Sequence, residues 1–238
     1  MSMQEHTVRA YAGELRRLRE LVARMGGLAE RQVADSVTAL VRGDAGLATE
    51  VIGRDTEIDA LEREIEDFCI RLLALRQPAG ADLRLVVAAL KIIHAIERIG
   101  DYARNAAKRS IVLAQQPRLG SLNGFQRMAR LVQENLKGAM DALVNEDAAR
   151  ADEVWAADKP VDEVYNGIFR EMLTFMMEDP RNITAATHLL FVAKNLERIG
   201  DHATNIAETV HYAVQGQALT EERPKGDNST YAVIRAQD

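Results

Sequence analysis

The sequence predicts an all-α protein: two tandem, duplicated three-helix bundles, six long helices in all, followed by a polar C-terminal tail. Composition is the first reason. Hydrophobic residues make up 47% of the 238 residues and aromatic residues only 5%, and five prolines leave long stretches uninterrupted. The dominant residues, Ala, Leu, Glu and Arg, lose little side-chain freedom in a helix. The second reason is an internal repeat, which favours one structural unit used twice.

The repeat is clearest at ERIGD, which occurs at Glu97–Asp101 and again at Glu197–Asp201. Around it, Leu90–Arg109 and Leu190–Thr209 share nine of twenty residues at an offset of 100. Upstream of these segments the matching offset is 103 residues, because the turn before the third helix is three residues shorter in the second half. We interpret this pattern as a duplication, with domains at 1–117 and 118–215 and a flexible tail at 216–238.

Each half is expected to contain three helices. Asp44 and Asp147 are natural N-caps for the second helix of each half, as Asp82 and Asn182 are for the third. Apolar residues recur at helical spacing, and no alternating strand pattern of any length appears. Short turns between such helices predict antiparallel bundles. The predicted helices are roughly His6–Arg42, Asp44–Arg76, Asp82–Gln115, Ser121–Asn145, Asp147–Glu178 and Asn182–Val214. In the tail, the short β-prone run TYAVIR has no assigned place.

Charge and cysteine content narrow the class of protein. The formal net charge is −6 with both signs mixed, and no basic block is present, so nucleic acid is not an expected partner. Cys69 is the single cysteine, which excludes an intrachain disulfide and fits a reducing compartment. The N-terminus lacks an apolar signal region, and the longest apolar run, Leu85–Leu90, is too short to span a bilayer. We therefore expect a cytoplasmic protein that can still dock on membrane proteins.

Acidic residues form two pairs in each half, and the members of a pair are four residues apart. Residues at this spacing lie on one helix face, about 5–6 Å apart. The two pairs of each half are equally distant from the intervening turn, so antiparallel helices bring them to the same height, roughly 30 Å from that turn. The carboxylates are Asp55, Asp59, Glu97 and Asp101 in the first half, and Asp158, Asp162, Glu197 and Asp201 in the second.

Four neighbouring carboxylates are costly unless a cation lies among them. Oxygen ligands suit hard or borderline cations, so we predict bound metal ions, with iron, zinc, manganese and magnesium as candidates. Glu97 and Glu197 continue apolar stripes, whereas Asp55 and Asp59 are expected beside one, which predicts a site on the flank of the bundle. The alternative is a solvated acidic surface that arginines such as Arg98 partly neutralise.

Other residues give weaker signals. Gly100 and Gly200 each cost a helix interior about 1 kcal/mol, which suggests close approach of a neighbouring backbone or of bound ions. Asn105 and Asn205 either hydrogen-bond the site or support helix packing.

A ferritin-like di-iron site requires Glu-x-x-His on two helices, and only Glu208–His211 has this spacing. His94 and His202 have no counterpart in the other half and are interpreted as structural or surface residues. No catalytic grouping is visible, so the protein is not expected to be an enzyme.

The segment RQPAGADLR at the hairpin turn, the doubled ERIGD followed by Asn, and the Asp-x-x-x-Asp pairs resemble the PhoU family over about residues 5–215. The resemblance implies two similar bundles side by side, whose eight carboxylates hold multinuclear metal clusters. It implies a cytoplasmic negative regulator of phosphate uptake and of the phosphate-starvation (Pho) response. Such a regulator acts as an adaptor between the phosphate ABC transporter and a sensor histidine kinase, in peripheral association with the membrane.

Three points stay open at the sequence level. A homodimer is possible. A metal-dependent hydrolase and a metal-storage protein are the alternative functions for clustered carboxylates. The two halves also differ, because the acidic line of the second helix continues with Glu62 and Glu66, where the other half has Tyr165 and Phe169. The two metal sites are therefore expected to differ in occupancy, or one of them to face a partner.

Overall fold

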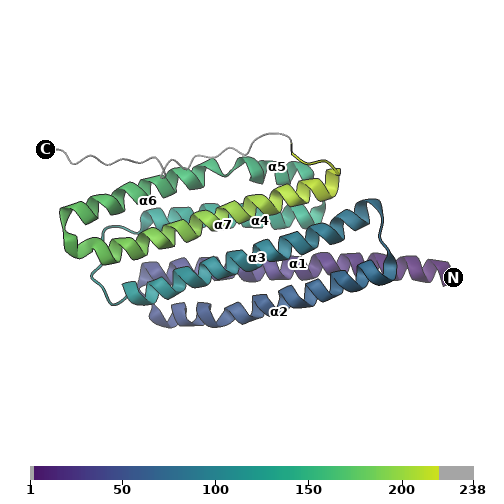
Figure 1. The fold of residues 1–238 in the computed structure, drawn as a ribbon, viewed down its shortest axis with the longest axis horizontal. Helices are drawn as coiled ribbons and strands as arrows, with labels where there is room; N and C mark the ends of the chain where they lie inside the picture. The colour runs from purple at the N-terminus through teal and green to yellow at the C-terminus, as the bar shows by residue number, and fades with distance from the viewer. Residues whose placement is uncertain (1–2, 220–238) are drawn as a thin grey trace.

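The protein's structure is a computed structural model in which residues 3–219 are described, and all regular elements in this range are helices (Figure 1). The all-α prediction is confirmed. The first half consists of α1 (Met3–Arg42), α2 (Ala45–Arg76) and α3 (Gly80–Leu113). The second half consists of α4 (Asn123–Asn145), α5 (Ala148–Ala156), α6 (Lys159–Glu178), the 3-10 helix η1 (Pro180–Asn182) and α7 (Ile183–Gln215). TYAVIR and the predicted tail from residue 220 onward lie outside the described residues.

The predicted fifth helix, Asp147–Glu178, is wrong as a single element, because the chain leaves the helix at Ala157 and resumes at Lys159. Pro160 accounts for the break. Proline has no N–H to donate, and in a helix interior its ring clashes with the carbonyl four residues earlier, here that of Ala156. In the first turn of a new helix the same residue is tolerated. Asp158 consequently lies in the break rather than in the middle of a helix.

The predicted helix starts are confirmed in part. The side chain of Asp44 accepts a hydrogen bond from the Leu47 amide at 2.9 Å, and that of Asp147 accepts one from the Arg150 amide at 3.0 Å. Asp82, in contrast, lies inside the first turn of α3 and accepts a hydrogen bond from the Tyr11 hydroxyl at 3.0 Å. Asn182 makes no side-chain capping bond. The third helix of each half therefore begins without the expected cap.

The two halves lie side by side with α3 against α7 and α1 against α4, so that α2 and the α5–α6 pair are the outer helices (Figure 1). One continuous apolar core runs through both halves. It includes Ile96 and Ile99 of α3 and Leu196 and Ile199 of α7, all with no exposed surface. Within the described range, no helix is long and apolar enough to cross a bilayer. The acidic pairs therefore lie where each outer helix meets α3 or α7.

Candidate metal centre

In the first half, α2 and α3 bring the acidic pairs together around an arginine that the sequence analysis did not consider. The Arg104 guanidinium forms ion pairs with Asp55 and, at 2.6 Å, with Asp101. Arg98 lies 3.6 Å from Glu97 Oε2 and 3.6 Å from Asp101 Oδ2. The site thus contains its own counter-charges, and a metal ion between Asp55 and Asp101 would have to displace Arg104.

Burial shapes the electrostatics of the acidic residues in this half. It raises the pKa of Asp55 above its ordinary value, and the Arg104 charge opposes that shift while the charges of Asp59 and Asp101 add to it. Burial also raises the pKa of Glu97, and the neighbouring charges of Asp101 and Glu62 raise it further. The charged form of both carboxylates is therefore disfavoured, and an added cation would stabilise it.

The second half presents the equivalent acids with a different set of neighbours. Asp158, Asp162 and Glu197 are buried, and Asp201 is half-buried. Thr204 takes the place of Arg104 in the repeat, and its hydroxyl can donate its one proton to the Gly200 carbonyl at 3.1 Å or to Asp158 Oδ1 at 3.4 Å. A hydroxyl carries no charge, so this half lacks the arginine that bridges the pairs in the first half.

The expected location on an open flank is correct for some of the acids and wrong for others. Asp59, Glu97, Asp101 and Asp201 retain partial exposure. Asp55 lies within the apolar stripe of α2, between Val51 and Ile58, with 5% of its surface exposed, and Asp158, Asp162 and Glu197 are buried as well. Helical spacing alone could not predict the burial of Asp55 and Asp158, because the Arg104 charge and the Thr204 hydroxyl beside them lie on another helix.

The two mid-helix glycines admit side chains rather than the backbone or ions that were expected. A β-carbon at Gly100 would lie 2.9 Å from Ile58 Cδ1, and one at Gly200 would lie 3.3 Å from Val161 Cγ1. Asn105 is half-buried and Asn205 is exposed. The glycines therefore allow α2 and α6 to pack closely against the helices that carry ERIGD.

Two buried amides beside the sites were missed by sequence reasoning. Gln32 of α1, 2% exposed, donates from Nε2 to the Val51 carbonyl at 3.3 Å and also hydrogen-bonds Asp55. Asn135 of α4 donates from Nδ2 to the Ala157 carbonyl at 3.5 Å. The two amides are 103 residues apart, the offset of the repeat, and each interrupts an apolar stripe. That coincidence was the signal that could have identified them.

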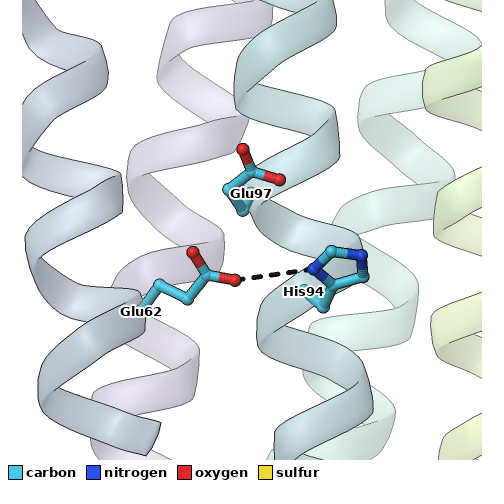
Figure 2. A group of neighbouring side chains, drawn as sticks. All are labelled: Glu62, His94 and Glu97. Atoms are coloured by element: carbon cyan, nitrogen blue, oxygen red, sulfur yellow. Dashed lines mark ion pairs between the residues drawn. The ribbon is translucent and has the colours of Figure 1, made fainter.

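A further group lies beside Glu97 on the first half. Glu62 of α2 and His94 and Glu97 of α3 converge, and one ligand atom from each lies within 4.8 Å of the others (Figure 2). His94 Nδ1 is 3.6 Å from Glu62 Oε1. At the equivalent place in the second half, Lys194 Nζ lies 3.0 Å from Glu197 Oε1 and 5.0 Å from the centre of the Tyr165 ring.

Comparison with known proteins covers both halves. A sequence model described as the PhoU domain matches residues 22–110 and again 125–210. A relative from Caulobacter vibrioides, named phosphate-specific transport system accessory protein PhoU homolog, is 54% identical over 226 residues, which are 94% of this chain and 98% of the relative.

Two solved structures share the fold. The crystal structure of PhoU from Pseudomonas aeruginosa is 42% identical with a TM-score of 0.82, covering 87% of this chain and 100% of that one. The structure of the phosphate transport system regulatory protein PhoU from Streptococcus pneumoniae is 26% identical with a TM-score of 0.82, covering 89% and 100%.

Proposed function

The chain belongs to the PhoU family, and on that premise we propose that it is an accessory protein of a phosphate-specific transport system. In this role it restrains phosphate uptake and keeps the phosphate-starvation response off when phosphate is plentiful. The observation that carries the proposal is the extent of the likeness, since 54% identity spans 98% of a relative named for that role. The regulatory part is supported by the name of the Streptococcus pneumoniae structure.

We propose that the protein works as an adaptor rather than as an enzyme. Long helices expose extended polar faces, a form suited to docking on the phosphate ABC transporter and a sensor histidine kinase at the membrane surface. The relatives are named as accessory or regulatory proteins. The test is gene deletion and complementation in phosphate-replete medium, with phosphate uptake and transcription of starvation genes as readouts. Derepression that wild-type protein reverses is the expected result, and unchanged uptake and transcription in the deletion strain would refute the proposal.

We further propose that the eight carboxylates bind metal ions such as iron, zinc, manganese or magnesium. The residues fit this role unequally. Buried acids with oxygen donors only are suited to hard cations in the second half, where Thr204 replaces Arg104. In the first half a metal competes with the guanidinium of Arg104. In the second half the Lys194 ammonium, 3.0 Å from Glu197 Oε1, competes as well, so we expect the two halves to bind such ions with different affinities.

Metal content tests this part of the proposal. The chain is purified without chelator or nickel resin and compared by elemental mass spectrometry with a folded variant carrying Asp101→Asn and Asp201→Asn, which changes both ERIGD segments and keeps Glu97. Metal in the wild type that is lost from the variant supports ion sites at ERIGD. Metal in neither protein means that the acids form a partner-facing surface. Many ions per chain without a partner favours metal storage, and phosphoester turnover lost in the variant favours a hydrolase.

A further inference from the structure

We propose that Glu62, His94 and Glu97 form a mononuclear site for a borderline divalent cation of the Zn²⁺ type, and that Lys194 supplies the corresponding positive charge in the second half (Figure 2). The site shares only Glu97 with the eight carboxylates proposed above, and its other two ligands lie outside both ERIGD segments. Because Glu97 is shared, changes at Glu62 and His94 distinguish this site from those acids, and the site does not depend on the regulatory role.

The internal repeat supplies the first argument. Glu62 corresponds to Tyr165 at the offset of 103, while His94 and Glu97 correspond to Lys194 and Glu197 at the offset of 100. In the second half, the Lys194 ammonium lies against a carboxylate and an aromatic face, at 3.0 Å from Glu197 Oε1 and 5.0 Å from the Tyr165 ring centre. Both neighbours attract a cation. This place in the repeated unit thus holds a positive charge.

The corresponding residues of the two halves also differ in net charge. Tyr165, Lys194 and Glu197 together carry no net charge, whereas Glu62, Glu97 and a neutral His94 carry two negative charges. Compared with the second half, the first half lacks the lysine ammonium and has a carboxylate and an imidazole in addition to the shared Glu, and both of these groups are metal ligands. One divalent cation would restore neutrality. The nearby Arg98 does not account for the difference, because Arg198 stands at the same position of the other half.

The distances between the ligand atoms of the trio are close to those around a bound metal ion. Two ligand atoms about 2.1 Å from a tetrahedral metal lie roughly 3.4 Å apart. His94 Nδ1 and Glu62 Oε1 are 3.6 Å apart, and Glu97 completes a trio within 4.8 Å, so rotamer changes of about 1 Å would close the site. His94 and Glu97 are three residues apart on α3, and Glu62 extends toward them from α2 (Figure 2).

Exposure and ligand type indicate which cation would bind. The His94 side chain is 64% exposed, so an ion can enter from solution and keep water in its remaining positions. The Arg98 side chain is 47% exposed and can turn away from Glu97 into solvent. An imidazole nitrogen beside two carboxylates favours zinc-like borderline cations over Mg²⁺ and Ca²⁺, which prefer oxygen alone.

The test is a Zn²⁺ titration of the full chain, freed of metal by chelator, by competition with a fluorescent zinc chelator. Co²⁺ absorption serves as a second readout of nitrogen and oxygen ligation. His94→Lys reproduces the residue of the second half and should preserve folding, which circular dichroism checks. His94→Lys and Glu62→Gln should each weaken Zn²⁺ binding at this site at least tenfold and remove its Co²⁺ spectrum. Glu66→Gln, an exposed acid one turn further along α2, is the matched control and should bind like the wild type.

A second variant separates this site from the ERIGD acids. Asp55→Asn with Asp101→Asn leaves the trio intact and should still bind Zn²⁺ there. If that variant loses Zn²⁺ while His94→Lys binds normally, the ion belongs to the carboxylate pairs and the proposal is overturned. Equal binding by the wild type, His94→Lys and Glu62→Gln would overturn it as well, because the trio would then be a solvated ion pair.

Discussion

Gly100 and Ile58 allow a quantitative test of how closely α2 and α3 pack. In Gly100→Ala, helix propensity gains about 1 kcal/mol. The new β-carbon would lie 2.9 Å from Cδ1 of Ile58, a side chain that is 1% exposed. Overpacking of this kind costs about 2 kcal/mol, so the variant should lose about 1 kcal/mol of unfolding free energy. Ile58→Val, which removes only Cδ1, should also cost about 1 kcal/mol.

The double variant, Gly100→Ala with Ile58→Val, shows whether contact between the new β-carbon and Cδ1 of Ile58 causes the loss of stability. With Cδ1 absent, the new methyl group fills the vacated space, so the double variant should be close to wild type rather than about 2 kcal/mol less stable, a coupling of about 2 kcal/mol. Urea denaturation followed by circular dichroism and by Trp155 fluorescence measures all four proteins. Gly53→Ala on α2, where a β-carbon meets nothing within 4 Å, is the control and should gain up to about 1 kcal/mol. Additive losses in the double variant would refute this account of the contact.

Three further predictions concern individual side chains. Cys69 is fully buried and burial raises its pKa to about 12, so Ellman's reagent at pH 8 should label it only after unfolding, and rapid labelling of the folded protein would contradict this. Arg104→Ala leaves Asp55 without its counter-charge and should cost about 2 kcal/mol at pH 7 in urea denaturation, with a smaller loss at low pH where Asp55 is protonated. Arg76 binds Glu14 through two nitrogens and lowers its pKa, so this pair contributes stability above the ordinary Glu value of 4.5 that is lost as the pH falls below it. Arg76→Gln should therefore lower the melting temperature slightly at pH 7 and leave it almost unchanged at pH 3, as thermal melts at both pH values can establish.

The sequence was sufficient for features that depend on local pattern and on the repeat. Helical spacing and the caps at Asp44 and Asp147 located the start of the second helix of each half. Counting residues from the turn placed Asp55 opposite Asp101, and in the structure both carboxylates contact Arg104. These inferences succeeded because a straight antiparallel hairpin leaves little freedom once its turn is located.

Features that depend on a third helix or on one special residue were not predicted. Asp55 was assigned to a partly wet surface because a carboxylate is rarely buried, yet Arg104 and the Gln32 amide stabilise it inside. Such contacts between helices cannot be inferred when the sequence of each helix is considered alone. The break before α6 was missed for another reason: the apolar spacing continues across it, and Pro160 was not weighed against that pattern.

The repeat also affects how the chain reaches its native topology. Two hairpins with similar sequences in one polypeptide can exchange partners during folding, which is a common failure of duplicated proteins. The difference in shape between the outer helices opposes that exchange. The uninterrupted helix α2 places Ile58 against Gly100, whereas the interrupted α5–α6 pair places the smaller Val161 against Gly200. An outer helix packed on the wrong inner helix would therefore place a side chain of the wrong size against the glycine, and this mismatch disfavours the exchanged topology.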